Sequence, residues 1–556
     1  MKKKLVRVAI VSLLFVTTTI NSFANTVPDE QFVIPAQDKG KIQAYFDDNS
    51  QGPGTEASYL AGIERFPDNS YGKAKLCKSE TDPACSQFST FQYNSFFPFC
   101  ERDEIHDCID SIYATSPTGK MTVYTSWNKD GLEVTKQDPP LIFSSGDFIP
   151  RGAGRSIVTL PGVMHKGGTD KYLVDVRMKG DVVNRVKSGQ GEGWGVWDPV
   201  FVASIKPVKL FLGNYKAPRV TISSTTQQLE FSEATPGCAL TENGKCWKAF
   251  GFPEDITFGL KLKIATPIYG WIHGRILVDQ FSSVKSNGIQ MFSISGKPME
   301  VPIAGGAQPN SDVDVKMKSN LNLIDGSSYY YTASNGSLAL ERFLGLRQLI
   351  GDKALASPQQ WSLRNIDKKE FVEMGLEAAR CIVKYQDIAG YVSTNATAYV
   401  SGPPKYNAAE QSLDYRVASP HYKNDGTVTK GFYSLAIRKD IAQCIYGVNS
   451  LPPSATVSII SEGGVASVAT SVARNTPDWI YLNASNFSYS APTIRVKFGA
   501  SSPLPSTTPS TTPTIDKPAT TTQANDIKKI KTISCIKGNT VKKILGSQCP
   551  KGYKKK

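Results

Sequence analysis

Short runs of alternating or β-branched residues constrain this chain most, because they recur over most of its length. Between residues 113 and 315 they include MTVYTSW, SIVTLPGV, KYLVDVRMKG, ITFGLKLKIA and IQMFSIS. Turn residues separate them about every ten positions, which favours antiparallel sheets over a parallel sheet with crossover helices. From residue 381 to 498 the pattern returns in LDYRVA, GFYSLAIR, WIYLNA and TIRVKF. We therefore predict a mainly β fold with two or more antiparallel β-sandwich domains.

A short helical insert is predicted between the two β-rich stretches. Residues 338–354 place Leu340, Phe343 and Leu344 at helical spacing, and residues 368–379 form a second candidate helix. The expected organisation is a loosely ordered lead-in at 25–75, a disulfide-pinned β-rich segment at 76–315, a mixed segment at 316–379 and a separate β-sandwich domain at 380–498.

The N-terminus has the features of an export signal. Lys2, Lys3, Lys4 and Arg7 precede the apolar run VAIVSLLFV, and Ser22-Phe23-Ala24 gives a small-residue cleavage pattern. We expect residues 1–24 to be a signal peptide and the mature chain to be secreted. No transmembrane segment is expected in the mature chain, because no other apolar run approaches the roughly 18 residues that a membrane helix needs.

The chain has ten cysteines. An even number behind an export signal predicts disulfides, whereas zinc would favour closely spaced cysteines or clustered histidines. The turn at 241–244 brings the ends of one C-x7-C segment together, and a Cys381–Cys444 bond would join two strands of the later sandwich. Connectivity is not encoded in spacing. The candidate partners are Cys77 with Cys85, Cys100 with Cys108, Cys238 with Cys246, Cys381 with Cys444, and Cys535 with Cys549.

The C-terminal end combines a linker with a basic module. Residues 501–522 read SSPLPSTTPSTTPTIDKPATTT, which cannot pack a core, so 499–527 is predicted to be a Ser/Thr/Pro linker. Residues 528–556 contain ten lysines and no acid. IKTISCI and VKKIL flank a turn at 537–540, which predicts a small hairpin. The lysines expected to mediate attachment are Lys528, Lys529, Lys531, Lys542, Lys543, Lys554, Lys555 and Lys556.

The positive charge is concentrated at the two ends of the chain. The formal net charge is +14, but residues 25–527 carry 49 basic and 49 acidic residues. A neutral body argues against a nucleic-acid partner, which requires a basic binding face. The basic tail is expected to bind an anionic cell-wall polymer or another anionic envelope surface.

Familiar catalytic motifs are missing from the sequence. It has no G-x-S-x-G, H-E-x-x-H, P-loop or C-x-x-C pattern, and the S-x-x-K match at 282–285 sits in a strand-rich stretch. We therefore assign no catalytic residue, no metal and no cofactor. An acidic group could hold Ca²⁺, but it lacks the EF-hand frame and suits a solvated face better. It consists of Glu101, Asp103, Glu104, Asp107 and Asp110.

One strand is the best candidate for a ligand-binding face. In WIHGR the side chains of Trp271, His273 and Arg275 would share one side of a strand, where they could bind an anionic or sugar ligand. The alternative is a structural group held by cation–π contacts and hydrogen bonds. Trp194 and Trp197, in a glycine-rich run, could likewise stack on a sugar or pack onto a core.

Several segments resemble a group of large, uncharacterised secreted proteins of Actinobacteria. They are LDYRVASPHYKNDGTVTKGFYSLAIRKDIAQCIYG, FCERDEIHDCIDSIYA, TLPGVMHKGGTDKYLVDV, GWIHGRI and the closing ISCIKGNTVKKILGSQCPKGYKKK. The resemblance implies a secreted, cell-surface location with a C-terminal sandwich and a lysine-rich, cysteine-containing tail. It transfers no catalytic residue.

These observations lead to one main expectation and two alternatives. We expect an exported cell-envelope protein with a non-catalytic binding or structural role, attached by its cationic tail. The alternatives are a secreted carbohydrate-active hydrolase, which needs two carboxylates facing each other across a cleft, and a surface coat protein.

Overall fold

The computed structural model forms two compact units, Met1–Ser502 and Pro503–Lys556. The predicted signal peptide and nearly all of the predicted linker lie outside the residues that the structure describes. Those residues are 32–33, 35, 38, 40–47, 56–66, 70–101, 106–125, 130–135, 143–144, 149–184, 194–268, 270–313, 337–366, 368–385, 388–400, 402–407, 409–410, 412–446, 454–460, 466–468, 470–489, 493–499, 532–537, 540–545 and 554–555.

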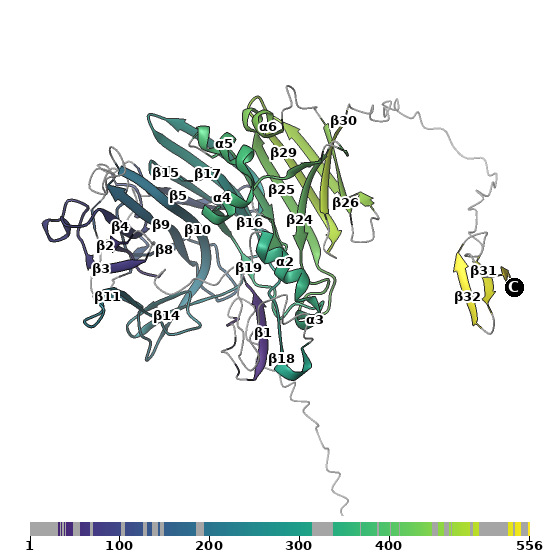
Figure 1. The fold of residues 1–556 in the computed structure, drawn as a ribbon, viewed down its shortest axis with the longest axis horizontal. Coiled ribbons are helices and arrows are strands. Elements are labelled where there is room, and N and C mark those ends of the chain that lie inside the picture. Colours follow the sequence, from purple (N-terminus) through teal and green to yellow (C-terminus); the bar gives the residue numbers. More distant parts are fainter. Residues whose placement is uncertain are drawn as a thin grey trace, which may run out of the picture. The chain divides into compact units, whose positions relative to one another are not determined.

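Strands dominate the first unit, which confirms the predicted mainly β fold (Figure 1). Its longest sheet is antiparallel except for one parallel pair, β16 with β21. The strands of this first sheet, in spatial order, are β3 (Tyr71–Leu76), β2 (Tyr59–Arg65), β4 (Thr90–Phe96), β9 (Lys171–Asn184), β10 (Trp194–Leu212), β20 (Ser362–Asn365), β16 (Trp271–Ser286), β21 (Gly390–Thr394), β25 (Lys430–Arg438), β29 (Trp479–Ser488) and β28 (Thr470–Asn475).

Shorter strands extend the first sheet at its flanks. β8 (Ser156–Thr159) pairs with the start of β9, and β7 (Leu132–Val134) pairs with β8. The end of β10 pairs with β14 (Lys245–Ala249), which forms a hairpin with β13 (Leu240–Glu242). Gly244 in this hairpin has φ +80°, so the predicted turn depends on a residue that tolerates the left-handed region.

A second sheet shares one strand with the first. It runs β6 (Met121–Thr125), β5 (Cys108–Thr115), β15 (Thr257–Ile264), β17 (Ile289–Glu300) and the second half of β16, and β19 (Gln359–Gln360) pairs with the end of β17. Residues 271–275 of β16 pair within the first sheet and residues 276–286 within the second, with a register shift at 278–280. Such a bulge lets a strand bend from one layer into the next. The largest core contains Tyr93 and Val176 of the first sheet and Leu260 and Ile294 of the second.

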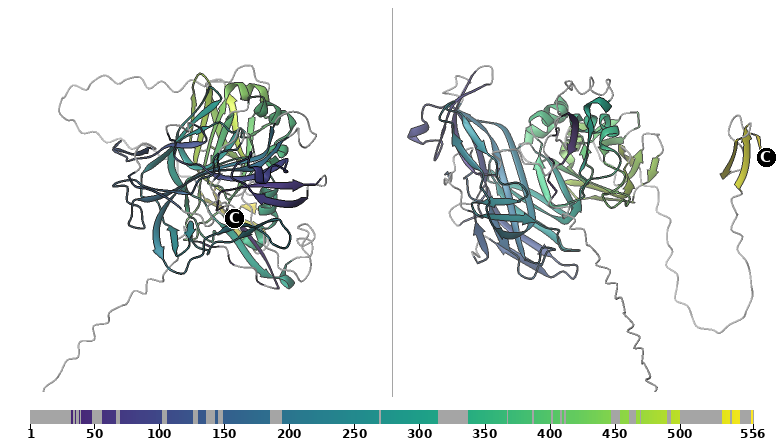
Figure 2. Two further views of the ribbon diagram at one scale, coloured as in Figure 1. Left: turned by 90° about the vertical axis from the view of Figure 1, so that its left-hand side faces the viewer. Right: turned by 90° about the horizontal axis from the view of Figure 1, so that it is seen from below.

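A third sheet packs against the later strands of the first. It contains β22 (Ala398–Tyr399), β23 (Lys405–Asn407), β24 (Ser412–Ala418), β30 (Thr493–Gly499), β26 (Ser454–Ile460) and β27 (Ala466–Val468). Leu435 and Leu482 of the first sheet share a second core with Tyr415 and Val496 of the third. In the right-hand view of Figure 2, the blue strands of the chain's first half and the green strands of its second half form adjoining groups.

The expected lead-in at 25–75 is wrong where the structure describes it, because this stretch contributes strands. β1 (Lys41–Phe46) pairs with β18 (Ala304–Pro309), and β2 and most of β3 also fall within it. The strand pattern in this stretch is weak, because its alternating apolar residues are few and polar residues lie between the strands. A further hairpin, β11 (Arg219–Ile222) with β12 (Leu229–Ser232), stands beside β3.

Helices occur in the predicted insert, but they are shorter than predicted. The candidate at 338–354 is two helices, α2 (Ser337–Gly345) and α3 (Arg347–Ile350), which pack with β1 and β18 around Phe46, Leu340 and Phe343. The candidate at 368–379 is α4 (Lys368–Glu373) followed by α5 (Leu376–Tyr385), with Gly375 at φ +96° between them. Among the described residues, the other helical elements are α6 (Lys439–Tyr446) and the 3₁₀ turns η2 (Pro83–Cys85) and η3 (Asn310–Asp312).

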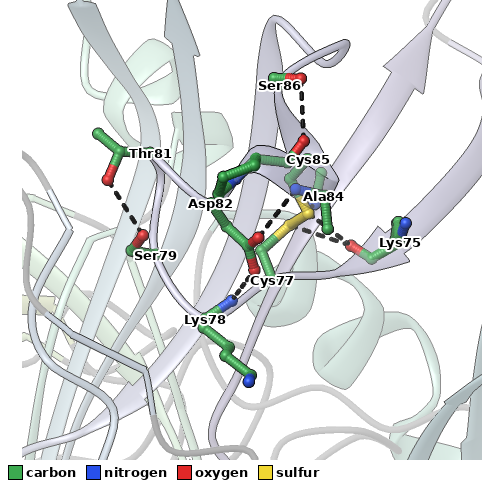
Figure 3. Close-up of a disulfide and its surroundings, with 11 residues drawn as sticks. Lys75, Cys77, Lys78, Ser79, Thr81, Asp82, Ala84, Cys85 and Ser86 are labelled. Atoms are coloured by element: carbon green, nitrogen blue, oxygen red, sulfur yellow. Dashed lines mark hydrogen bonds between the residues drawn. A yellow bond between two sulfur atoms is a disulfide. The ribbon is translucent and has the colours of Figure 1, made fainter.

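Four of the five predicted cysteine pairs form disulfides: Cys77–Cys85, Cys100–Cys108, Cys238–Cys246 and Cys381–Cys444. Figure 3 shows the first of them, where Asp82 accepts hydrogen bonds from the backbone N–H groups of Lys78 and Ala84, both at 2.9 Å. The expectation that Cys381–Cys444 joins two strands is wrong. It joins helices α5 and α6, because Leu376–Tyr385 is rich in good helix formers and the strand begins only at Gly390.

The expected boundary near residue 380 coincides with no break in the first sheet. β16 of the earlier segment pairs with β20 and β21, and β21 pairs with β25 of the later segment. Residues up to Ser502 accordingly cluster as one unit. Among the residues that the structure describes, no helix has the length and apolar character needed to cross a membrane.

The second unit contains the predicted tail hairpin. β31 (Thr532–Lys537) pairs with β32 (Thr540–Leu545), and β33 (Lys554–Lys555) pairs with β31 on its other side. The register joins Lys537 to Thr540, as expected for a turn at 537–540. Cys549 lies outside the described residues, so the Cys535–Cys549 bond stays a prediction.

Candidate functional site

The predicted ligand face lies in the part of β16 that belongs to the first sheet. Trp271, His273 and Arg275 share one side of the strand, since Ile272 between them packs in the largest core and Trp271 in the second. Their exposed fractions are 0%, 3% and 2%. The face is therefore in the interior of the first unit.

Tyr399 of β22 is the shared neighbour of this group. The guanidinium carbon of Arg275 is 4.7 Å from the centre of the Tyr399 ring, and the His273 ring is 4.9 Å from it. Arg275 Nη1 donates to the carbonyls of Thr394 and Ala396, both at 2.7 Å. The backbone N–H of Gly402 donates to His273 Nε2 at 3.3 Å, so this imidazole nitrogen is an acceptor.

A second arginine joins the same group from β20. Arg364 is paired with His273 across the sheet, and its Nη1 and Nη2 donate to the two carboxylate oxygens of Glu370, each at 2.6 Å. Arg364 Nε also reaches the Tyr399 hydroxyl at 3.4 Å. Because Glu370 belongs to α4, this bidentate pair ties the helix to the sheet. Sequence reasoning missed Arg364 and Glu370, which come from the mixed segment and share no periodicity with β16.

The position of the Trp271 ring explains why residue 390 of the neighbouring strand β21 is a glycine. A Cβ at Gly390 would lie 2.3 Å from the Trp271 ring and 2.7 Å from the Ala436 carbonyl. Only glycine leaves room for the indole there. The arrangement around β16 thus holds sheets and helix together by cation–π contacts, carbonyl bonds and one ion pair. These contacts match the structural alternative considered for Trp271, His273 and Arg275.

Two members of the acidic group around the second disulfide, Asp107 and Asp110, bind other segments of the chain. Asp107, with φ +53° and 5% exposure, accepts bonds from the backbone N–H groups of Ala265 (3.0 Å) and Thr266 (3.1 Å) and from the Thr266 hydroxyl (2.9 Å). Asp110 lies 3.3 Å from the ammonium of Lys263. Asp103 and Glu104 lie outside the described residues, and within the described part no cluster of metal-ligating side chains occurs.

His165 is buried in the neutral form. The Gly167 N–H donates to its Nδ1 at 3.0 Å, while Nε2 lies 3.1 Å from the Val208 carbonyl and 2.8 Å from the Thr169 hydroxyl. Nδ1 is therefore the acceptor and Nε2 carries the proton. Burial lowers the pKa of His165, and the bond to Val208 opposes that shift.

A cluster of charged side chains that sequence reasoning missed lies on β9, on β10 and at Arg155, just before β8. Arg155 binds Asp175 in bidentate fashion, with Nε 2.7 Å from one carboxylate oxygen and Nη2 bonded to the other. Arg177 and Lys206 stand near this pair. The alternation of Asp175 and Arg177 with apolar residues is visible in KYLVDVRMKG, but it predicts a solvated face. In the structure Asp175 is 4% and Arg177 6% exposed.

The tail lysines are placed by the backbone register of the second unit. Lys542 of β32 and Lys555 of β33 both pair with Cys535, and Lys543 pairs with Ser534. The side chains of Trp194 and Trp197, the other sugar-stacking candidates, lie outside the described residues. No protein-family model, curated protein or solved structure matches the chain. Fold and site define a mainly β, disulfide-bonded chain in which Arg275 and Arg364 bind groups of the first unit.

Proposed function

We propose that the protein is an exported component of the cell envelope with a non-catalytic binding or structural role, held at the surface by its C-terminal unit. It would group with the secreted actinobacterial proteins that it resembles. One observation carries the proposal: ten lysines fall in residues 528–556, within the second compact unit, whereas residues 25–527 have balanced charge. The four disulfides support an oxidising compartment such as the cell exterior.

Four of these lysines lie in strands of the three-stranded sheet of the second unit. Lys542 and Lys543 sit in β32, and Lys554 and Lys555 form β33, on either side of β31. Attraction between such charges and an anionic surface decays over about 8 Å at physiological ionic strength. The partner must therefore be an anionic polymer or surface that comes into close contact with the unit.

The test replaces tail charge without removing the tail. In the full-length protein, Lys542, Lys543, Lys554 and Lys555 are changed together to Gln, and the cell-bound and medium fractions are compared. The matched control changes four exposed lysines of the body to Gln: Lys209, Lys245, Lys285 and Lys405.

We expect the tail variant and a deletion of 528–556 to move into the medium, while the body variant stays cell-bound. Unchanged retention of both tail variants would refute attachment by the tail. Release of polysaccharide fragments by the purified protein would instead favour the hydrolase alternative, and lattice assembly would favour the coat protein.

A further inference from the structure

The charged cluster on β9 and β10 faces away from the largest core. Val174 and Val176 of β9 pack in that core, so Asp175 and Arg177 project from the opposite side of the strand. On β10, Ala203 and Ile205 pack in the same core, and the register places Ser204 opposite Asp175. Lys206, two residues further along, therefore lies on the same face as Asp175.

Arg155 is held by several contacts, but one of its hydrogen-bond donors has no partner among the described residues. Its exposed fraction is 2%, and its guanidinium carbon lies 5.4 Å from the centre of the Phe96 ring. Nε and Nη2 bind Asp175, and Nη2 also donates to the Ala239 carbonyl at 2.9 Å. The remaining nitrogen, Nη1, is buried and has no hydrogen-bond partner in the described part of the chain. A buried donor of this kind carries a desolvation cost that a bound acceptor would remove.

The cluster contains three positively charged side chains, Arg155, Arg177 and Lys206. The carboxylates of Asp175 and Glu56 act on all three of them. Burial lowers the pKa of Arg177 to about 10, and it lowers the pKa of Lys206 as well, while Asp175 opposes both shifts. Positive charge in a poorly solvated place is stabilised by a nearby anion.

We propose that this cluster binds a tetrahedral oxyanion, a phosphate or sulfate group, which accepts from Arg155 Nη1 and pairs with Lys206. Lys206 is partly exposed, so the anion approaches along its side chain. Arg155 supplies directed N–H donors and Lys206 a point charge, which together suit an oxyanion. This site is in the first unit and is independent of attachment by the tail.

The experiment measures binding of inorganic phosphate and of sulfate by calorimetry at constant ionic strength, with chloride as the exchanged anion. The full mature chain is compared with Lys206→Met, which keeps an apolar stem, and with Lys209→Met, an exposed lysine on the same strand. Arg155→Met is the second site variant, accepted only if its circular dichroism matches that of the wild type.

We expect saturable binding by the wild type and the Lys209→Met protein, and binding about tenfold weaker or more in Lys206→Met, because one charge-assisted bond is lost. Equal loss in the two lysine variants, or no saturable binding by the wild type, would overturn the proposal. A poly(glycerol phosphate) oligomer serves as a second probe. Tighter Lys206-dependent binding of the oligomer than of phosphate supports the site and identifies a polymer as the source, whereas the reverse order supports it with the free ion as the source.

Discussion

The Cys381–Cys444 disulfide should be the most stabilising of the four, and its effect can be worked out from loop length. It spans a sequence separation of 63, whereas Cys238–Cys246 spans 8. In the chain-entropy relation, closing loops of these sizes lowers the entropy of the unfolded chain and so raises its free energy by about 4 and about 2.5 kcal/mol, respectively. Replacing both cysteines of the long-loop bond by Ala should therefore lower the free energy of unfolding by roughly 1.5 kcal/mol more than the same change in the short-loop bond.

Guanidinium unfolding followed by tryptophan fluorescence gives the required comparison. Helices α5 and α6 keep their apolar contacts through Ile382 and Ile441, so the long-loop variant is expected to fold. Circular dichroism before denaturation checks this, and an unchanged slope against guanidinium shows that the unfolded state is comparable. Equal losses in the two double variants, or a larger loss in the short-loop variant, would show that loop length does not set the stabilisation here.

Three further substitutions or conditions test individual contacts. Asp175→Asn leaves the Arg155 guanidinium buried without its counter-charge and should cost about 3–5 kcal/mol in chemical unfolding; a loss below 1 kcal/mol would contradict the buried pair. His165 has a pKa below that of the unfolded state, so its contribution to stability is present in full above the unfolded-state pKa of about 6.5 and is lost as the pH falls from there through the lower folded-state pKa; melting temperatures between pH 7.5 and 5.5 should decline less in His165→Asn than in the wild type. Gly390→Ala forces a Cβ against the Trp271 ring and should lower the free energy of unfolding by about 1–3 kcal/mol. The control Gly345→Ala should not destabilise the protein, because a Cβ there meets nothing within 4 Å. Equal melting temperatures for the two variants would count against the close packing at Trp271.

Strand content and the three short-range disulfides could be predicted because both depend on local sequence. A strand repeats every two residues, and the two cysteines of a C-x7-C segment are only eight positions apart. The merging of the two β-rich segments into one sheet could not be predicted in this way. It depends on the parallel pairing of β16 with β21, which brings residues 271–274 beside residues 390–393 of the later segment.

The candidate site shows the same division between local and non-local information. Alternation along β16 correctly placed Trp271, His273 and Arg275 on one face. It could not show that Tyr399 would cover that face, because the tyrosine is more than a hundred residues further along the chain. Burial of Arg155 and Asp175 is equally non-local, since Arg155 precedes β8, Asp175 lies in β9 and Arg155 also donates to the Ala239 carbonyl of a third segment.

The dependence of binding on salt concentration should distinguish the two anion-binding regions that we propose. Attraction by the tail acts between lysines and an external polymer, so it should weaken as the Debye length falls from about 10 Å at 0.1 M to about 3 Å at 1 M. The oxyanion at Arg155 and Lys206 would bind beside side chains that are 2–6% exposed, such as Arg155 and Arg177, where salt screens less. Raising sodium chloride should therefore release the protein from cells well before it weakens the Lys206-dependent binding of phosphate. Parallel loss of both would indicate that the phosphate is held by surface charge, which would contradict a buried site.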